Sequence, residues 1–271
     1  MLKYFFKSPQ LQLGLIHSLG GAGGTLLAQC ISAMKNVFLL SECNPLSAHL
    51  FDYNLNPYIQ LQNWHPKLYA VVKKKFDKTQ LCDPKSFCHF LKLLCRYLHQ
   101  NKQHLIVRDY NYIDYIGLPY IPFPPMYSNL MFAIKEAFTT CQVVLVRNPL
   151  AQYNSLRSHT ITKNILTPKK FIEGYLKFLG DFSDCYWLKY EDIVADPTHY
   201  IAATCGVLQI PFSEEFIHEF YKKTAVTGNF NRINQKMITL SNTQLIEDSW
   251  TEDFKTHPQF NLLMSQLGYE S

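Results

Sequence analysis

The stretch GLIHSLGGAGGTLLAQCISAM, residues 14–34, has residue types that bind anions through the backbone. An apolar run leads into a glycine-rich turn at 19–25, and a helix is predicted directly after it. The N–H groups of such a turn, with those of the first helical residues, form a concave anion site. The stretch has no lysine or arginine before Lys35 and no Gly-Lys-Ser/Thr run, so any cation for a phosphate-like ligand must come from elsewhere.

A second motif, QVVLVRNPLAQYNSLRSH, ends a predicted strand at Arg147 and places Ser155 on the helix that follows. Pro149 suits the first position of that helix. Two helical turns span about 12 Å and bring Ser155 back to the sheet edge, where both side chains could hold one phosphate. The alternative is an arginine paired with a surface carboxylate and a serine without a ligand.

A third motif, YWLKYEDIVADP, predicts a strand, an acidic turn and the start of a helix. Asp196 precedes Pro197 and is predicted to cap that helix, which is a structural role.

Short apolar runs alternate with helical patterns along the chain. The expected strands are residues 11–17, 37–40, 104–108, 142–147 and 185–190, and the expected helices are 25–35, 84–101, 128–139, 149–159, 168–180, 196–208 and 213–223. This alternation predicts a three-layer α/β/α fold with a central parallel sheet of about five strands, and ligand sites at the carboxyl ends of the strands. Segments 41–82 and 109–127 are too long for simple connections, so we expect them to build an acceptor site or lid.

The composition predicts a single domain over residues 1–271, because 47% of the residues are hydrophobic and only 17% are charged. The net charge of +5 is mild and the lysine pairs are scattered, which favours a small anionic ligand over nucleic acid. We recognise no signal peptide or transmembrane segment, and the eight cysteines form no CxxC pair, so a cytoplasmic location is expected. Cys88, Cys95 and His99 share a helical face that could bind metal, but its leucines and phenylalanines favour core packing.

In this order and spacing, the glycine-rich loop, VRNPLAQYNS and LKYEDIVADP resemble the sulfotransferase family that uses 3′-phosphoadenosine 5′-phosphosulfate (PAPS). The resemblance spans roughly residues 11–240 and is similar in pattern to tyrosylprotein and carbohydrate sulfotransferases. It implies a P-loop NTPase-like fold, the product 3′-phosphoadenosine 5′-phosphate (PAP), no metal, and a small-molecule, carbohydrate or peptide acceptor.

The resemblance assigns the nucleotide site residue by residue. The loop would hold the 5′-phosphosulfate, Arg147 and Ser155 the 3′-phosphate, and the polar stretch TGNFNR would close over the nucleotide. The implied binding residues are Gly20, Gly21, Ala22, Gly23, Gly24, Thr25, Arg147, Ser155, Thr227, Gly228, Asn229 and Arg232.

The family loop usually carries a basic residue where this chain has Gly21. Glu42 follows Gly21 by 21 residues, a spacing similar to that of the catalytic glutamate in tyrosylprotein sulfotransferases, which implies a general base. Arg108 ends a strand where the resembling enzymes have a lysine, which implies that it supplies the missing charge. The alternatives are a surface acid for Glu42 and a salt bridge from Arg108 to Asp109 or Asp114.

The sequence therefore predicts a sulfotransferase that acts on a hydroxyl or amine. One rival is a P-loop kinase or NTPase that uses Asp109 as a magnesium ligand. The other is a non-catalytic nucleotide-binding protein on the same fold. The oligomeric state stays open.

Overall fold

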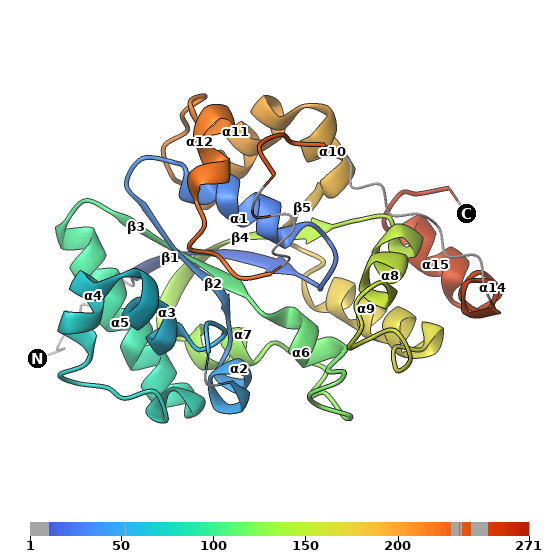
Figure 1. Cartoon of the computed structure of the whole chain (residues 1–271), viewed down its shortest axis with the longest axis horizontal. Coiled ribbons are helices and arrows are strands. Elements are labelled where there is room, and N and C mark those ends of the chain that lie inside the picture. Colours follow the sequence, from blue (N-terminus) through green and yellow to red (C-terminus); the bar gives the residue numbers. More distant parts are fainter. Residues whose placement is uncertain (1–10, 52, 229–232, 234, 240–248, 271) are drawn as a thin grey trace, which may run out of the picture.

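The computed structural model describes residues 11–51, 53–228, 233, 235–239 and 249–270. Its centre is a five-stranded parallel sheet in the order β2-β3-β1-β4-β5 (Figure 1). The strands are β1 (Leu11–Ser18), β2 (Val37–Cys43), β3 (His104–Asp109), β4 (Phe138–Val146) and β5 (Tyr186–Lys189). The predicted α/β fold with a central parallel sheet of about five strands is confirmed.

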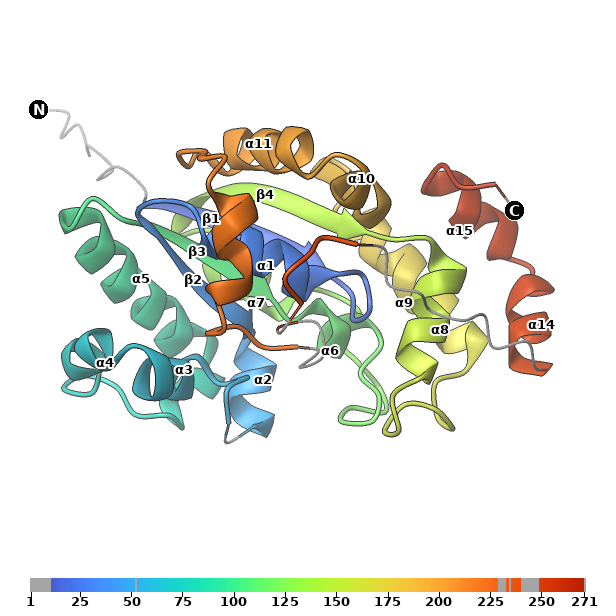
Figure 2. The ribbon, with the colours of Figure 1, turned by 45° about the horizontal axis from the view of Figure 1, so that its top comes forward.

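Helices cover both faces of the sheet, as Figures 1 and 2 show. Successive side chains of a strand point to opposite faces, so each strand contributes to two apolar clusters. On β1, Leu15 packs in one cluster with Leu91 of α5, whereas Ile16 packs in the other with Leu27 of α1. Burial on both faces explains why the strands read as nearly continuous apolar runs.

The helices have the following bounds. They are α1 (Gly24–Ser32), α2 (Pro45–Leu50), α3 (Pro57–Trp64), α4 (Pro66–Val72), η1 (Gln80–Cys82), α5 (Pro84–Gln100), α6 (Asn111–Tyr115), α7 (Asn129–Ile134), α8 (Pro149–Arg157), α9 (Pro168–Asp181), α10 (Tyr190–Ala195), α11 (Pro197–Leu208), α12 (Phe216–Glu219), η2 (Phe220–Lys222), α14 (Ser249–Lys255) and α15 (Phe260–Gln266). Within the described ranges, no helix is both long and apolar enough to cross a membrane.

Two of the expected helices depart furthest from their predicted bounds. The helix expected over 128–139 ends at Ile134, because Phe138 already pairs with Leu11 as the first residue of β4. The helix expected over 213–223 is one short α-turn, α12, followed by the 3₁₀ turn η2. Segment 41–82, for which the sequence predicted no helix, contains α2, α3, α4 and η1.

Asx-Pro pairs start several of these helices. Asn44, Asn56, Asp83 and Asn148 each precede a proline, and each side chain accepts a hydrogen bond from a backbone N–H of the helix that follows. The carboxylate or amide oxygen accepts a hydrogen bond from a backbone N–H of the first turn that has no partner within the helix, and proline suits the first position of a helix. Asp196 caps α11 in the same way, as predicted.

Candidate active site

The glycine-rich loop joins β1 to α1 along a tight path. Gly23 has a φ of 96°, and a Cβ on it would lie 2.3 Å from the ring of Tyr190. A Cβ on Gly24 would lie 2.8 Å from Nε of Arg108. The first N–H groups of α1 have no partner within the helix, so this helix end carries positive partial charge toward the space in front of the loop.

Arg108 and Glu42 form an ion pair beside this loop. Nη2 of Arg108 lies 2.6 Å from Oε1 of Glu42, and the two side chains are 6% and 13% exposed. Nη1 of Arg108 also donates to the carbonyl of Thr227 at 3.2 Å, whereas Nε has no hydrogen-bond partner among the described residues. Arg108 therefore lies against the loop at Gly24, and its carboxylate partner is neither of the two aspartates considered from the sequence.

Glu42 reaches this position through an irregular strand end. The register between β2 and β3 shifts between Leu40 and Cys43, and Glu42 has a φ of 52°. A left-handed conformation costs a residue with a Cβ roughly 1–2 kcal/mol. Such strain persists where the surrounding contacts fix it, and here the contact is the ion pair with Arg108.

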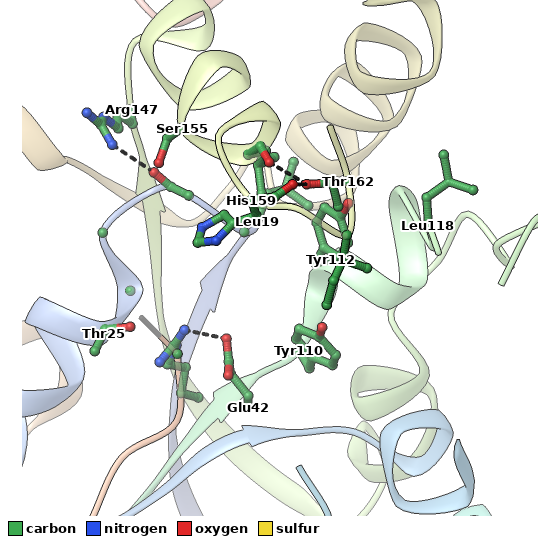
Figure 3. A pocket seen from close by; sticks show the side chains of 18 of the residues that line it. Leu19, Thr25, Glu42, Tyr110, Tyr112, Leu118, Arg147, Ser155, His159 and Thr162 are labelled. Atoms are coloured by element: carbon green, nitrogen blue, oxygen red, sulfur yellow. Dashed lines mark hydrogen bonds and ion pairs between the residues drawn. The ribbon is translucent and has the colours of Figure 1, made fainter. Parts of the chain in front are cut away.

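Arg147 and Ser155 line the same cavity, Arg147 from the end of β4 and Ser155 from α8 (Figure 3). Nη1 of Arg147 donates to the carbonyl of Gly21 at 3.0 Å, and its guanidinium lies 4.8 Å from the centre of the Tyr190 ring. The structure thus brings the predicted pair together and orients Arg147 by a hydrogen bond and a cation–π contact. That the pair holds a 3′-phosphate stays a prediction.

Two further side chains fix the surroundings of the loop. Gln152 of α8 donates from Nε2 to the carbonyl of Gly20 at 2.8 Å. Glu191 of α10 accepts from the N–H of Asn148 at 3.2 Å and from the hydroxyl of Tyr269 at 2.6 Å. The start of α8 is therefore held against both the loop and the C-terminal segment.

Segment 226–228 closes one side of the site. The carbonyl of Thr227 accepts from Oγ1 of Thr25 at 3.4 Å, and its side chain lies 2.9 Å from Oγ of Ser41. Gly228 lines the cavity next to Thr25. Asn229 and Arg232, which the resemblance also assigned to the nucleotide, lie outside the described residues.

The cavity has a volume of about 370 Å³. Strands β1 to β4 all end at it, as expected for a parallel sheet. In Figure 3, Thr25 and Glu42 lie toward one side of it, and Arg147 and Ser155 toward the other. Ala22 does not line it, because its side chain is buried in the core.

Tyrosines form the rest of the wall near Glu42. Tyr110, Tyr112 and Tyr120 line the cavity, and burial raises the pKa of the Tyr110 hydroxyl, with the charge of Glu42 as the second cause. The Tyr110 hydroxyl is therefore uncharged at neutral pH. The wall is apolar with polar tips, which suits a ligand that carries a hydroxyl on an apolar body.

No protein-family model and no curated protein matches the sequence, so the comparison depends on solved structures. The sulfotransferase domain of the olefin synthase from Synechococcus PCC 7002 matches with a TM-score of 0.57 and 17% identity, over 96% of this chain and 95% of that chain. The sulfotransferase domain from the curacin biosynthetic pathway matches with a TM-score of 0.54 and 17% identity, over 97% and 99%. The chain has the sulfotransferase fold.

Within this sulfotransferase fold, Asp109 does not face the cavity. It is 1% exposed, and its Oδ2 accepts from Asn111 at 2.7 Å and from Ser128 at 2.9 Å and lies 3.3 Å from His17. Burial and the charge of Asp109 raise the pKa of Asp114 in the same network. A magnesium ligand must reach the phosphates, so this position disfavours the kinase alternative.

The described part of the chain contains no group of three His, Cys, Asp or Glu side chains that could hold a metal ion. Cys88 and Cys95 instead pack in the core with Leu91 and Leu94 of α5, as the sequence favoured.

Tyr190 and Gln152 are the loop contacts that sequence analysis did not assign. Tyr190 belongs to the KYED motif, so its place in the chain was noted, but its contacts with Gly23 and Arg147 depend on the packing of α10 against the loop. Nothing in the sequence indicated that Gln152 contacts the loop, because a glutamine on a helix is usually exposed.

Proposed function

We propose that this protein is a sulfotransferase that moves a sulfuryl group from PAPS to a hydroxyl or amine. The observation that carries the proposal is the position of Arg108. Its buried guanidinium lies against Gly24 at the N-terminus of α1 and is paired with Glu42, and its Nε has no partner among the described residues. A cation, a helix N-terminus and a carboxylate at one point are the groups that this transfer requires.

The residues present fit the donor. The N–H groups at the start of α1 and the guanidinium of Arg108 would hold the phosphosulfate. Arg147 and Ser155 would hold the 3′-phosphate, and segment 226–228 would cover one side. The Nε of Arg108 has no partner in the part of the chain that the structure describes, which supports this fit, because a buried donor without a partner is costly unless a ligand satisfies it.

Sulfuryl transfer forms a bond between the acceptor oxygen and sulfur, breaks the bond from sulfur to the bridging oxygen of the donor, and releases the acceptor proton. Glu42 accepts that proton. Arg108 stabilises the negative charge that develops on the bridging oxygen of the departing PAP. Arg147 and Gln152 of α8 each donate a hydrogen bond to a carbonyl of the loop and keep the loop fixed. The loop N–H groups therefore need little rearrangement during the reaction.

A second candidate, favoured by the ion pair itself, is a nucleotide-binding protein without turnover. In the structure, Oε1 of Glu42 is occupied by Arg108, so a base role requires the other oxygen or a shift of Arg108 when the donor binds. Nucleotide binding without transfer to any acceptor supports this candidate.

Thermal denaturation with PAP, ADP and ATP tests the proposal, with and without magnesium. A ligand that binds the folded state raises the melting temperature. We expect PAP to stabilise the protein without magnesium, and ADP to do so much less, because ADP lacks the 3′-phosphate. Equal stabilisation by PAP and ADP contradicts the 3′-phosphate site, and a requirement for ATP with magnesium supports a kinase instead.

A further inference from the structure

A second cavity, of about 960 Å³, adjoins the first. Glu42, Tyr120 and His159 line both cavities, so the carboxylate of Glu42 lies where the two spaces meet. The loop and Arg147 line only the first. A group that enters through the second cavity can therefore reach Glu42 without passing the loop or Arg147.

The wall of the second cavity away from this junction is aromatic and aliphatic. Tyr53, Leu55, Trp64 and Val226 contribute to it. Phe51 supports it from behind, since its ring lies 5.0 Å from that of Tyr53 and 4.7 Å, edge to face, from that of Tyr120. Tyr53 and Trp64 come from segment 41–82, and Tyr120 from segment 109–127, the two segments that the sequence left without an interpreted motif.

Charge on this wall is confined to the junction. Among the described residues, no lysine or arginine lines the second cavity. Its ionisable groups besides tyrosine are Glu42, which is already paired with Arg108, and the exposed His159. Burial, followed by the effect of Tyr120, raises the pKa of Tyr53 to about 12, so this phenol is neutral at neutral pH.

We propose that the second cavity is the acceptor site and that it takes an uncharged, largely apolar alcohol. This inference depends on the proposed sulfuryl transfer. An acidic peptide or a sulfated sugar would bring negative charge toward Glu42 with no lysine or arginine on the described wall to balance it, and burying an unpaired charge is unfavourable. An apolar body gains from burial against the aromatic wall, and side-chain hydroxyls and amides such as Asn54 and Thr224 can orient its polar end.

Two probes of matched shape test the charge preference: 2-naphthol, which is neutral at pH 7, and 6-hydroxy-2-naphthoate, which adds a carboxylate to the same rings. Their binding is measured by titration calorimetry on the full chain saturated with PAP. We expect 2-naphthol to bind at least tenfold more tightly, and to bind while PAP stays bound. PAP binding is measured separately, so the donor site is tested on its own.

A positive charge added to the wall gives the matched variants. Tyr53→Lys places a cation at a half-exposed position that lines only the second cavity, and should shift the preference toward the naphthoate by fivefold or more. Phe132→Lys makes the same change at a similarly exposed aromatic residue that lines neither cavity, and should leave the preference unchanged.

The outcomes separate the two proposals. Equal or tighter binding of the naphthoate to the wild type overturns the acceptor class. Displacement of 2-naphthol by PAP assigns the second cavity to the nucleotide and overturns its role as acceptor site. Selective 2-naphthol binding by a chain that fails to bind PAP overturns the proposed donor, while the apolar preference of the second cavity is supported.

Discussion

Replacing Glu42 by glutamine should strengthen donor binding while it abolishes most of the turnover. Glu42 and the anionic donor compete for the same guanidinium, because Arg108 lies between the carboxylate and Gly24. A hydrogen bond to a charged group contributes about 1.5–3 kcal/mol. If removing the carboxylate makes about 1.4 kcal/mol of this interaction free energy available for binding PAPS, the affinity for PAPS rises about tenfold.

The same substitution should destabilise the free protein. The pair is 2.6 Å long and its side chains are 6% and 13% exposed, so Glu42→Gln leaves a buried cation without a counter-charge. We expect a loss of about 1.5–3 kcal/mol in the free energy of urea unfolding, which added PAPS partly restores. Turnover with the acceptor alcohol should fall by about 10²–10⁴, because the general base is lost.

Calorimetry gives the affinities for PAPS and PAP, and the effect should be larger for PAPS, which carries the additional sulfuryl group. Glu219→Gln is the control: its ion pair with Lys222 has the same 2.6 Å distance, but the two side chains are 44% and 52% exposed. It should alter neither affinity nor turnover. Weaker PAPS binding by Glu42→Gln would refute the competition between Glu42 and the donor for Arg108. Full turnover by the same variant would refute the role of Glu42 as the general base.

Three other changes test neighbouring parts of the site and fold. Arg147→Ala should weaken PAP binding about tenfold or more and leave ADP binding unchanged in calorimetry; an equal loss for both nucleotides contradicts a 3′-phosphate contact. Gly23 has a positive φ, and a Cβ on it would lie 2.3 Å from Tyr190, so Gly23→Ala should lower the free energy of unfolding by at least about 2 kcal/mol. A Cβ on Gly180 would meet open space, so Gly180→Ala should raise the free energy of unfolding by about 0.5–1 kcal/mol. Similar midpoints of urea unfolding for the two variants would contradict the packing argument. Burial holds the pKa of His65 below its usual 6.5, so acidification through about pH 6.5 protonates the unfolded state first and lowers the free energy of unfolding, by less than about 1.4 kcal/mol per pH unit. In urea titrations at several pH values, His65→Gln should reduce this pH dependence of the free energy of unfolding. An unchanged pH dependence in the variant excludes His65 as its source.

The sheet was predictable because its strands are short apolar runs buried on both faces. All five expected strands are present, and their ends shift by only a few residues, except that β4 begins at Phe138 within a segment expected to be helical. Thr139 and Thr140 are β-branched and fit a strand, but the pairing of this segment with β1 is a tertiary contact that helical spacing does not reveal. The helices of segment 41–82 were missed although Asn44-Pro45 and Asn56-Pro57 are start signals.

The site was predictable to the extent that strand ends define it. Glu42, Arg108 and Arg147 all follow from the rule that parallel strands deliver their last residues to one edge. The ion pair between Glu42 and Arg108 was not predicted, because it requires the order β2-β3-β1 and a left-handed residue at position 42. Sequence alone gave Arg108 two nearer candidates, Asp109 and Asp114, and the structure buries both in a separate hydrogen-bond network.

The missing loop cation has a structural cause in the packing of α8. Gly21 has a φ of 78°, and a Cβ on it would lie 3.2 Å from both the Gln152 carbonyl and Cγ of Leu156. A lysine there would be strained and crowded by the same helix that holds the loop through Gln152. A cation on β3 avoids this conflict, since Arg108 approaches the loop from the opposite side, at Gly24. Because that cation is buried it needs a counter-charge in the free protein, and the carboxylate that supplies it, Glu42, is the group that we propose takes the acceptor proton.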